Sequence, residues 1–134
     1  MTHPESCRQP AAMALVVLAI LQGVMLAAML ARVPPHPPFT IALFAMGPWL
    51  GACLAAIAVS LMCGAESSRA GKGFALLSTV MALVSYGPQK WVDPAIGQIW
   101  PAVLAAQIAC ATILIRTSLP LAIRFRRKAQ AVPS

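Results

Sequence analysis

Residues 39–63 form a run of 25 residues without a charged side chain, and this run limits most strongly what the chain can fold into. An α-helix rises about 1.5 Å per residue and the hydrocarbon core of a bilayer is about 30 Å thick. About 20 apolar residues therefore suffice to cross a membrane. We predict that this run is a membrane-spanning helix.

Three further apolar segments accompany it, separated by short polar or proline-rich connections. Only 10% of the 134 residues are charged, whereas soluble domains contain about 25%. Short connections make successive helices antiparallel neighbours. The predicted fold is an all-α membrane protein, an antiparallel up-down bundle of four transmembrane helices with short loops. The predicted domain covers residues 11–123, with spans at 11–31, 39–63, 73–91 and 98–115.

The positions of the basic residues predict the orientation of this bundle. Eight of the ten Lys and Arg residues fall on one side of a four-span chain, and only Arg32 and Lys90 fall on the other. Basic residues mark the cytoplasmic side. Residues 1–10 are therefore predicted to be a cytoplasmic tail of a protein of the bacterial inner membrane. Residues 116–134 are predicted to be a basic tail whose first part, interrupted by Pro120, lies in the membrane interface and whose remainder is cytoplasmic. The competing interpretation of residues 11–31 is a secretory signal, although the apolar run is longer than such signals usually are.

The ends of the spans carry residues typical of membrane interfaces. Aromatic rings favour the headgroup level, which predicts Trp91 and Trp100 as anchors. The fourth span is expected to end before Arg116, whose side chain would extend towards the headgroups. The alternative, a span that continues through Ile123, would hold Arg116 within the bilayer, where the other spans contain no acid to pair with it. The net charge of +7 would also suit nucleic acid, but four basic residues directly follow an apolar segment, which favours anionic lipid. The basic anchors in that run are Arg124, Arg126, Arg127 and Lys128.

Small residues repeat along two of the predicted spans. Gly47, Gly51 and Ala55 recur at every fourth position of the second span, and Ala102 and Ala106 begin a similar row in the fourth. Helices in lipid associate through close approach of backbones over small residues. These rows are predicted to be packing faces, and we expect the fourth span to face the second.

Chemistry at membrane depth has few candidate groups. The chain resembles small four-span drug exporters in size and span count, but its first span offers Gln22 where they carry an acidic residue. Cys53 and Cys110 reach similar depth and could form a soft-metal site, but their spacing is not specific and packing explains them better. His3 and His36 fall on opposite sides, which argues against haem. No catalytic residue, metal or cofactor is predicted.

Gln22 and Gln107 remain as amides that would bond across helices or orient a polar solute. A second polar cluster, formed by residues 86–93 and 98–101, is predicted to be an interfacial anchor or a small-molecule contact. The leading hypothesis is a non-catalytic accessory or assembly subunit that packs through its small-residue faces, on itself or on a larger complex. The alternative is a channel or carrier for a small, weakly polar solute, and a membrane-embedded enzyme is a third.

Overall fold

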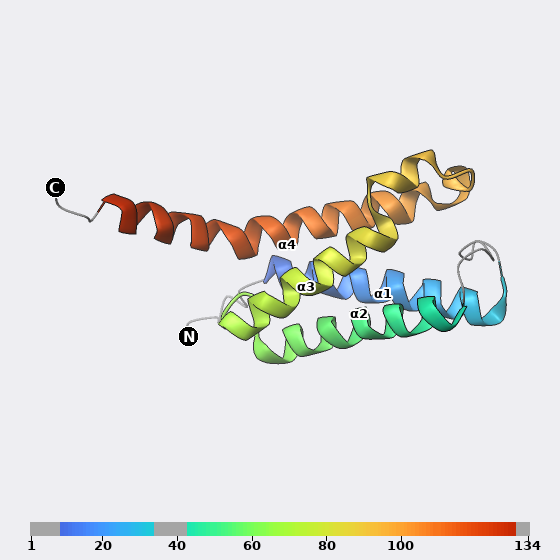
Figure 1. Ribbon diagram of the computed structural model, residues 1–134, viewed down its shortest axis with the longest axis horizontal. Helices are drawn as coiled ribbons and strands as arrows, with labels where there is room; N and C mark the ends of the chain where they lie inside the picture. Colours follow the sequence, from blue (N-terminus) through green and yellow to red (C-terminus); the bar gives the residue numbers. More distant parts are fainter. Residues whose placement is uncertain (1–8, 34–42, 131–134) are drawn as a thin grey trace, which may run out of the picture.

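The computed structural model describes residues 9–33 and 43–130, and the side chains of residues 9–33 and 44–118. This part of the chain is helical and contains no strand. Its four α-helices are α1 (Pro10–Ala31), α2 (Leu43–Cys63), α3 (Arg69–Tyr86) and α4 (Ile96–Gln130), and the 3₁₀-helix η1 (Pro88–Val92) precedes α4. Figure 1 shows each α-helix returning along the one before it, with α3 crossing the bundle obliquely.

The order of the helices around the bundle differs from one expectation. α1 packs on α2 and α4, and α3 also packs on α2 and α4, so that α2 and α4 lie diagonally opposite and make no contact in the described part of the chain. The expectation that the fourth span faces the second was therefore wrong. In an up-down bundle of four helices, neighbours in sequence are neighbours in space, and the first helix closes the ring with the last.

The third and fourth helices have boundaries other than those predicted. α3 begins at Arg69 because the Ser68 hydroxyl accepts a hydrogen bond from the Gly71 N–H at 2.8 Å, which caps the helix. α3 ends at Tyr86 and is followed by Gly87 and by Pro88, the first residue of η1. Residues 39–42 of the predicted second span lie outside the described residues.

α4 is one continuous helix that extends past the bundle. It has 35 residues, which corresponds to a length of about 50 Å. It continues through Pro120, where the sequence suggested a separate interfacial piece. Figure 1 shows its last turns projecting beyond the end where α2 meets α3. α4 is therefore longer than the thickness of the hydrocarbon core of a bilayer, which is about 30 Å.

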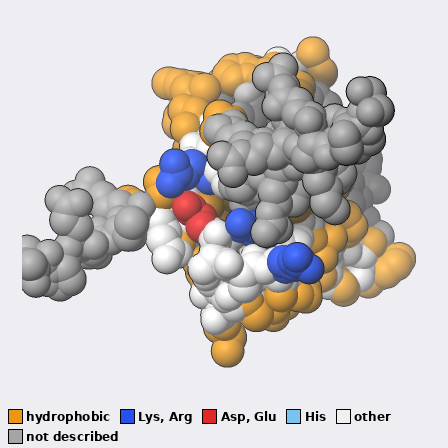
Figure 2. Space-filling model, turned by 90° about the vertical axis from the view of Figure 1, so that its left-hand side faces the viewer, with side chains coloured by type: hydrophobic (Ala, Val, Ile, Leu, Met, Phe, Trp, Pro, Cys, Tyr) orange, Lys and Arg blue, Asp and Glu red, His pale blue; other side chains and the backbone are white. Residues whose placement is uncertain are grey.

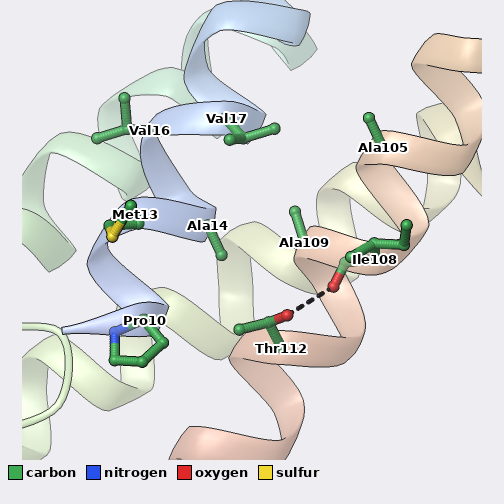
Figure 3. Close-up of a pocket in the computed structure, with 9 residues that line it drawn as sticks. All are labelled: Pro10, Met13, Ala14, Val16, Val17, Ala105, Ile108, Ala109 and Thr112. Carbon is green, nitrogen blue, oxygen red and sulfur yellow. Dashed lines mark hydrogen bonds between the residues drawn. The ribbon is translucent and has the colours of Figure 1, made fainter. Parts of the chain in front are cut away.

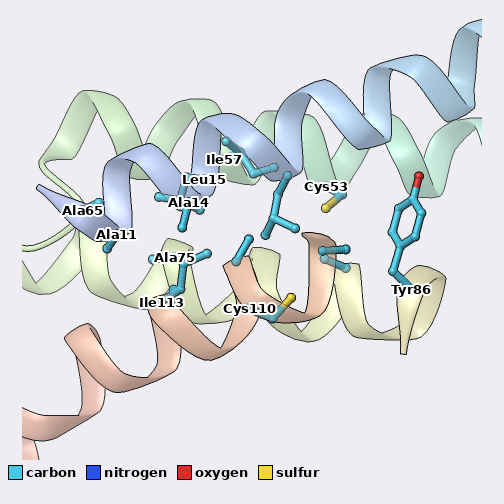
Figure 4. Close-up of a cluster of buried hydrophobic side chains, with 14 of the residues drawn as sticks. Ala11, Ala14, Leu15, Cys53, Ile57, Ala65, Ala75, Tyr86, Cys110 and Ile113 are labelled. Carbon is cyan, nitrogen blue, oxygen red and sulfur yellow. The ribbon is translucent and has the colours of Figure 1, made fainter. Parts of the chain in front are cut away.

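The interior of the bundle consists of small and branched side chains (Figure 4). The core cluster contains seven buried alanines, and the six that lie in helices let the helix backbones approach closely, as is common for helices in lipid. Larger aliphatic side chains fill the remaining space. Those with almost no exposed surface are Leu15, Leu18, Leu50, Ile57, Val103 and Ile113.

The four α-helices of the described residues differ in how apolar they are. Three helices, α1, α2 and α4, are long and apolar enough to span a membrane. α3 is less apolar than the other three. Its first turn contains Arg69 and Lys72, and its buried face contains the polar residues Ser78, Thr79 and Ser85. The large apolar side chains that α3 exposes are Phe74, Leu77, Val80 and Val84.

Candidate functional site

A line of polar groups crosses the interior of the bundle near its middle. Gln22 has no exposed surface, and its amide nitrogen Nε2 donates to Cys53 Sγ at 3.5 Å. The Cys53 thiol in turn donates to the Ser78 carbonyl oxygen at 3.7 Å. Thiols are weak donors and weak acceptors. The line therefore links α1, α2 and α3 by contacts that contribute little energy individually.

Most buried hydroxyls bond to backbone carbonyls of a neighbouring turn or helix. Thr79 Oγ1 donates to the Ala75 carbonyl at 2.7 Å, and Ser60 Oγ crosses from α2 to the Gly71 carbonyl at 2.8 Å. Hydroxyls in apolar helices commonly bond in this way. Three buried polar atoms have no hydrogen-bond partner among the described residues, namely Gln22 Oε1, Trp49 Nε1 and Ser85 Oγ.

The cysteines of the core have surroundings typical of packing. Cys53 and Cys110 are buried among aliphatic side chains, and Cys63 is exposed near the end of α2. Figure 4 places both buried cysteines within the apolar cluster. The described residues contain no group of three His, Cys, Asp or Glu side chains that could hold a metal ion.

Glu66 joins three elements at the end of the bundle where α2 meets α3. Its Oε1 accepts from the Ala11 N–H at 2.7 Å, which occupies one of the free donors at the start of α1. Its Oε2 lies 3.3 Å from Arg116 Nη2. Arg116 thus has an acidic partner, which the sequence interpretation missed because it considered only the spans. Figure 2 looks at this end and shows basic side chains gathered beside an acidic group.

The opposite end contains the second polar cluster. Trp91 Nε1 donates to Gln107 Oε1 at 3.2 Å, and Gln107 Nε2 donates to the Tyr86 carbonyl at 3.3 Å. Gln107 therefore bridges η1, α3 and α4. Trp91 and Trp100 are about half exposed, and their role as interfacial anchors stays a prediction. The other predicted anchors have side chains that lie outside the described part of the structure. They are Arg124, Arg126, Arg127 and Lys128.

A short turn at this end is held by Asp93. The Ala95 N–H donates to Asp93 Oδ1, and the Lys90 ammonium donates to Oδ2, both at 2.9 Å. These two hydrogen bonds lower the pKa of the Asp93 carboxyl group. The arrangement matches an Asx-type turn that leads into α4. The polar side chains Lys90 and Asp93 thus bond to each other and to the backbone, so a ligand is not needed to account for them.

The predicted packing residues have different surroundings. Ala106 is buried in the core and Ala102 packs partly against it. Gly47 lies near α1, where a Cβ atom would be 3.9 Å from the terminal methyl of Met29. Gly51 and Ala55 are exposed, and a Cβ atom at Gly51 would meet nothing within 4 Å. Their role as packing residues towards another chain stays a prediction.

The comparisons with known proteins add no assignment. No family model, curated protein or solved structure matches the chain.

Proposed function

We propose that all four α-helices cross the membrane, with both termini in the cytoplasm and the inner membrane of a bacterial cell as the location. α2 and α4 run in the same direction, so the chain must return between them, and α3 provides that return (Figure 1). The outward face of α3 carries large apolar side chains. The low mean hydropathy of the whole helix comes from the basic residues of its first turn and from the polar residues of its buried face. The distribution of basic residues favours the cytoplasm for the end that contains Arg69, Lys72 and Arg116.

Cysteine labelling tests this topology. Cys53 and Cys110 are buried, so a C7S/C63S chain suits labelling with a membrane-impermeant maleimide. We expect V92C to react in cells whose outer membrane alone has been permeabilised, and S67C to react only once the inner membrane is opened as well. Both positions are exposed, at opposite ends of α3. Equal labelling of the two from one side would contradict a membrane-crossing α3.

We further propose that the protein is a non-catalytic accessory or assembly subunit, and the outward face of α2 carries this proposal. The other helices expose large side chains along their length, whereas the large apolar side chains exposed on α2 are Phe44 and Met62, near its two ends. Between them α2 exposes a surface of small residues and one proline. We call it the α2 outer face: Ala45, Pro48, Gly51, Ala52, Ala55 and Ala58.

The α2 outer face suits another transmembrane helix better than lipid chains alone. Small residues let a second backbone approach closely, so that dispersion contacts and weak hydrogen bonds form along both helices. The partner is a transmembrane helix of a second copy or of a larger complex. Gly51 has the open space above its backbone that such an approach requires.

The alternative of a channel or carrier has weaker support. Its best polar candidate, Gln22, is enclosed, with no exposed surface, and its amide nitrogen is already bonded to Cys53. A solute-dependent growth defect in a deletion strain would favour the alternative over the assembly subunit.

Bulky residues on the α2 outer face test the assembly proposal. We expect G51L/A55L to weaken association at least tenfold, or about 1.4 kcal/mol, because two leucine side chains separate the helices. Native mass spectrometry after purification in a mild detergent gives the ratio of assembly to the 14.0 kDa monomer. Leucine is a better helix former than glycine, so the variant does not weaken α2 itself.

The matched control places two leucines on other outward faces. Ala27 on α1 and Ala111 on α4 are also exposed alanines, and A27L/A111L should associate as the parent protein does. A monomeric parent protein, or equal loss of association in both double variants, would contradict the proposal.

A further inference from the structure

An apolar groove runs along the outside of the bundle between α1 and α4. Its volume is about 680 Å³, and Figure 3 shows Ala14 and Ala109 pointing towards one another between the two helices. Larger side chains form its walls, and two of them, Met13 and Ile108, are more than half exposed. Among the described residues that line the groove, Thr112 alone is polar, and its hydroxyl donates to the Ile108 carbonyl at 2.9 Å. The groove thus offers a ligand only apolar contacts.

A cation lies at one end of this groove. Ile108, Thr112 and Arg116 are spaced by four residues and therefore share one face of α4, with Arg116 one turn beyond the groove. The Arg116 side chain is 50% exposed, and among the described residues its one bonded atom is Nη2, which pairs with Glu66. A guanidinium group has five N–H donors in a planar fork, which matches a phosphate group. Donors thus remain for an anion.

We propose that the α1–α4 groove binds one acyl chain of an anionic phospholipid, whose phosphate accepts hydrogen bonds from Arg116. The distance along α4 from Ala105 to Arg116 is about 16 Å, from 11 residues of helical rise. Half the thickness of the bilayer core is about 15 Å. A chain that starts at Arg116 and lies in the groove therefore ends near the middle of the bilayer. This lipid belongs to the leaflet at the Glu66 end.

The walls of the groove favour an acyl chain over a second helix. A close helix–helix contact needs small residues on the surface, as on the α2 outer face. Met13, Val16 and Ile108 instead project outward and leave a narrow channel floored by alanines. Arg69 and Lys72 add positive charge at the same end of the bundle, which favours an anionic headgroup over a zwitterionic one.

Native mass spectrometry of lipid adducts tests the proposal. The delipidated protein in mild detergent is titrated with palmitoyl-oleoyl phosphatidylglycerol or with the phosphatidylcholine of the same chains. We expect one phosphatidylglycerol to bind at least fivefold more tightly than phosphatidylcholine. A105F fills the groove and should reduce the binding of both lipids, whereas R116Q should remove the preference between them.

Two controls separate the site from general electrostatics. R69Q removes one charge at the same end but outside the groove, and it should keep the preference for phosphatidylglycerol. E66Q keeps an acceptor for the Ala11 N–H but removes a negative charge beside the phosphate, so it should tighten phosphatidylglycerol binding. Folding of each variant is checked by its elution as a single peak.

Three results would overturn the proposal. The first is equal binding of the two lipids by the parent protein, and the second is a loss of preference in R69Q as large as in R116Q. The third is an A105F variant that binds lipid normally but no longer associates, because a helix would then occupy the groove. The α2 outer face is not altered in these variants, so the assembly proposal stands or fails separately.

Discussion

Replacing Gly71 with alanine is expected to destabilise the protein by about 1–3 kcal/mol, the range for overpacking of a close contact. A Cβ atom at Gly71 would lie far inside van der Waals contact with the carbonyl group of Gly64. That carbonyl cannot easily move, because it accepts from the Ser67 and Ser68 N–H groups at 3.2 Å each. Gly64 itself has φ of 81°, a conformation that favours glycine. The α2–α3 turn therefore depends on both glycines.

Gly73 provides the matched control, two residues further along α3. A Cβ atom there would meet nothing within 4 Å, so G73A should stabilise α3 by about 0.5–1 kcal/mol through helix propensity. Unfolding by sodium dodecyl sulfate in mixed micelles, followed by circular dichroism, measures both variants. Effects of the same sign in G71A and G73A would contradict the close packing of α3 against the turn.

Replacing Glu66 with alanine is expected to cost about 2–3 kcal/mol. The larger part is the hydrogen bond from the Ala11 N–H to a charged oxygen, for which about 1.5–3 kcal/mol is typical. The negative charge at the start of α1 adds about 0.3–1 kcal/mol through the helix dipole. The ion pair with Arg116 adds less than about 1 kcal/mol, because Arg116 is half exposed.

Two further variants separate these contributions. E66Q retains an oxygen that accepts from Ala11 and should lose less than half as much stability as E66A, whereas R116Q should lose less than about 1 kcal/mol. The same unfolding assay serves for all three. An R116Q variant as unstable as E66A would mean that the ion pair, and not the cap of α1, holds the end of the bundle together.

The helical class and three candidate spans were predictable because they depend on local composition. Long runs without charge, such as residues 39–63, require a helix in lipid whatever packs around it. The third segment was also recognised as a helix, yet its boundaries were displaced by several residues. The start of α3 depends on the cap that Ser68 provides, and its end depends on Gly87 and Pro88, which follow Tyr86.

Contacts between distant residues were not predictable from local patterns. In the sequence, Glu66 is one polar residue of a short connection between two spans, but its carboxylate accepts a hydrogen bond from Ala11, which lies 55 residues away. Small-residue rows identified Ala106 and Gly51 by the same spacing, although one is buried and the other exposed. The period of a helix shows which residues share a face, but the neighbour of that face is decided by the order of helices around the bundle.

Site-specific photocrosslinking in intact membranes of the native host tests the assembly proposal most directly. A small diazirine amino acid replaces Ala55 on the α2 outer face or, as control, Ala111 on α4, and the products are identified by mass spectrometry. We predict a crosslink from position 55 to a second copy or to another membrane protein, and crosslinks from position 111 to lipid. Crosslinks to lipid alone from both positions would contradict an assembly through α2.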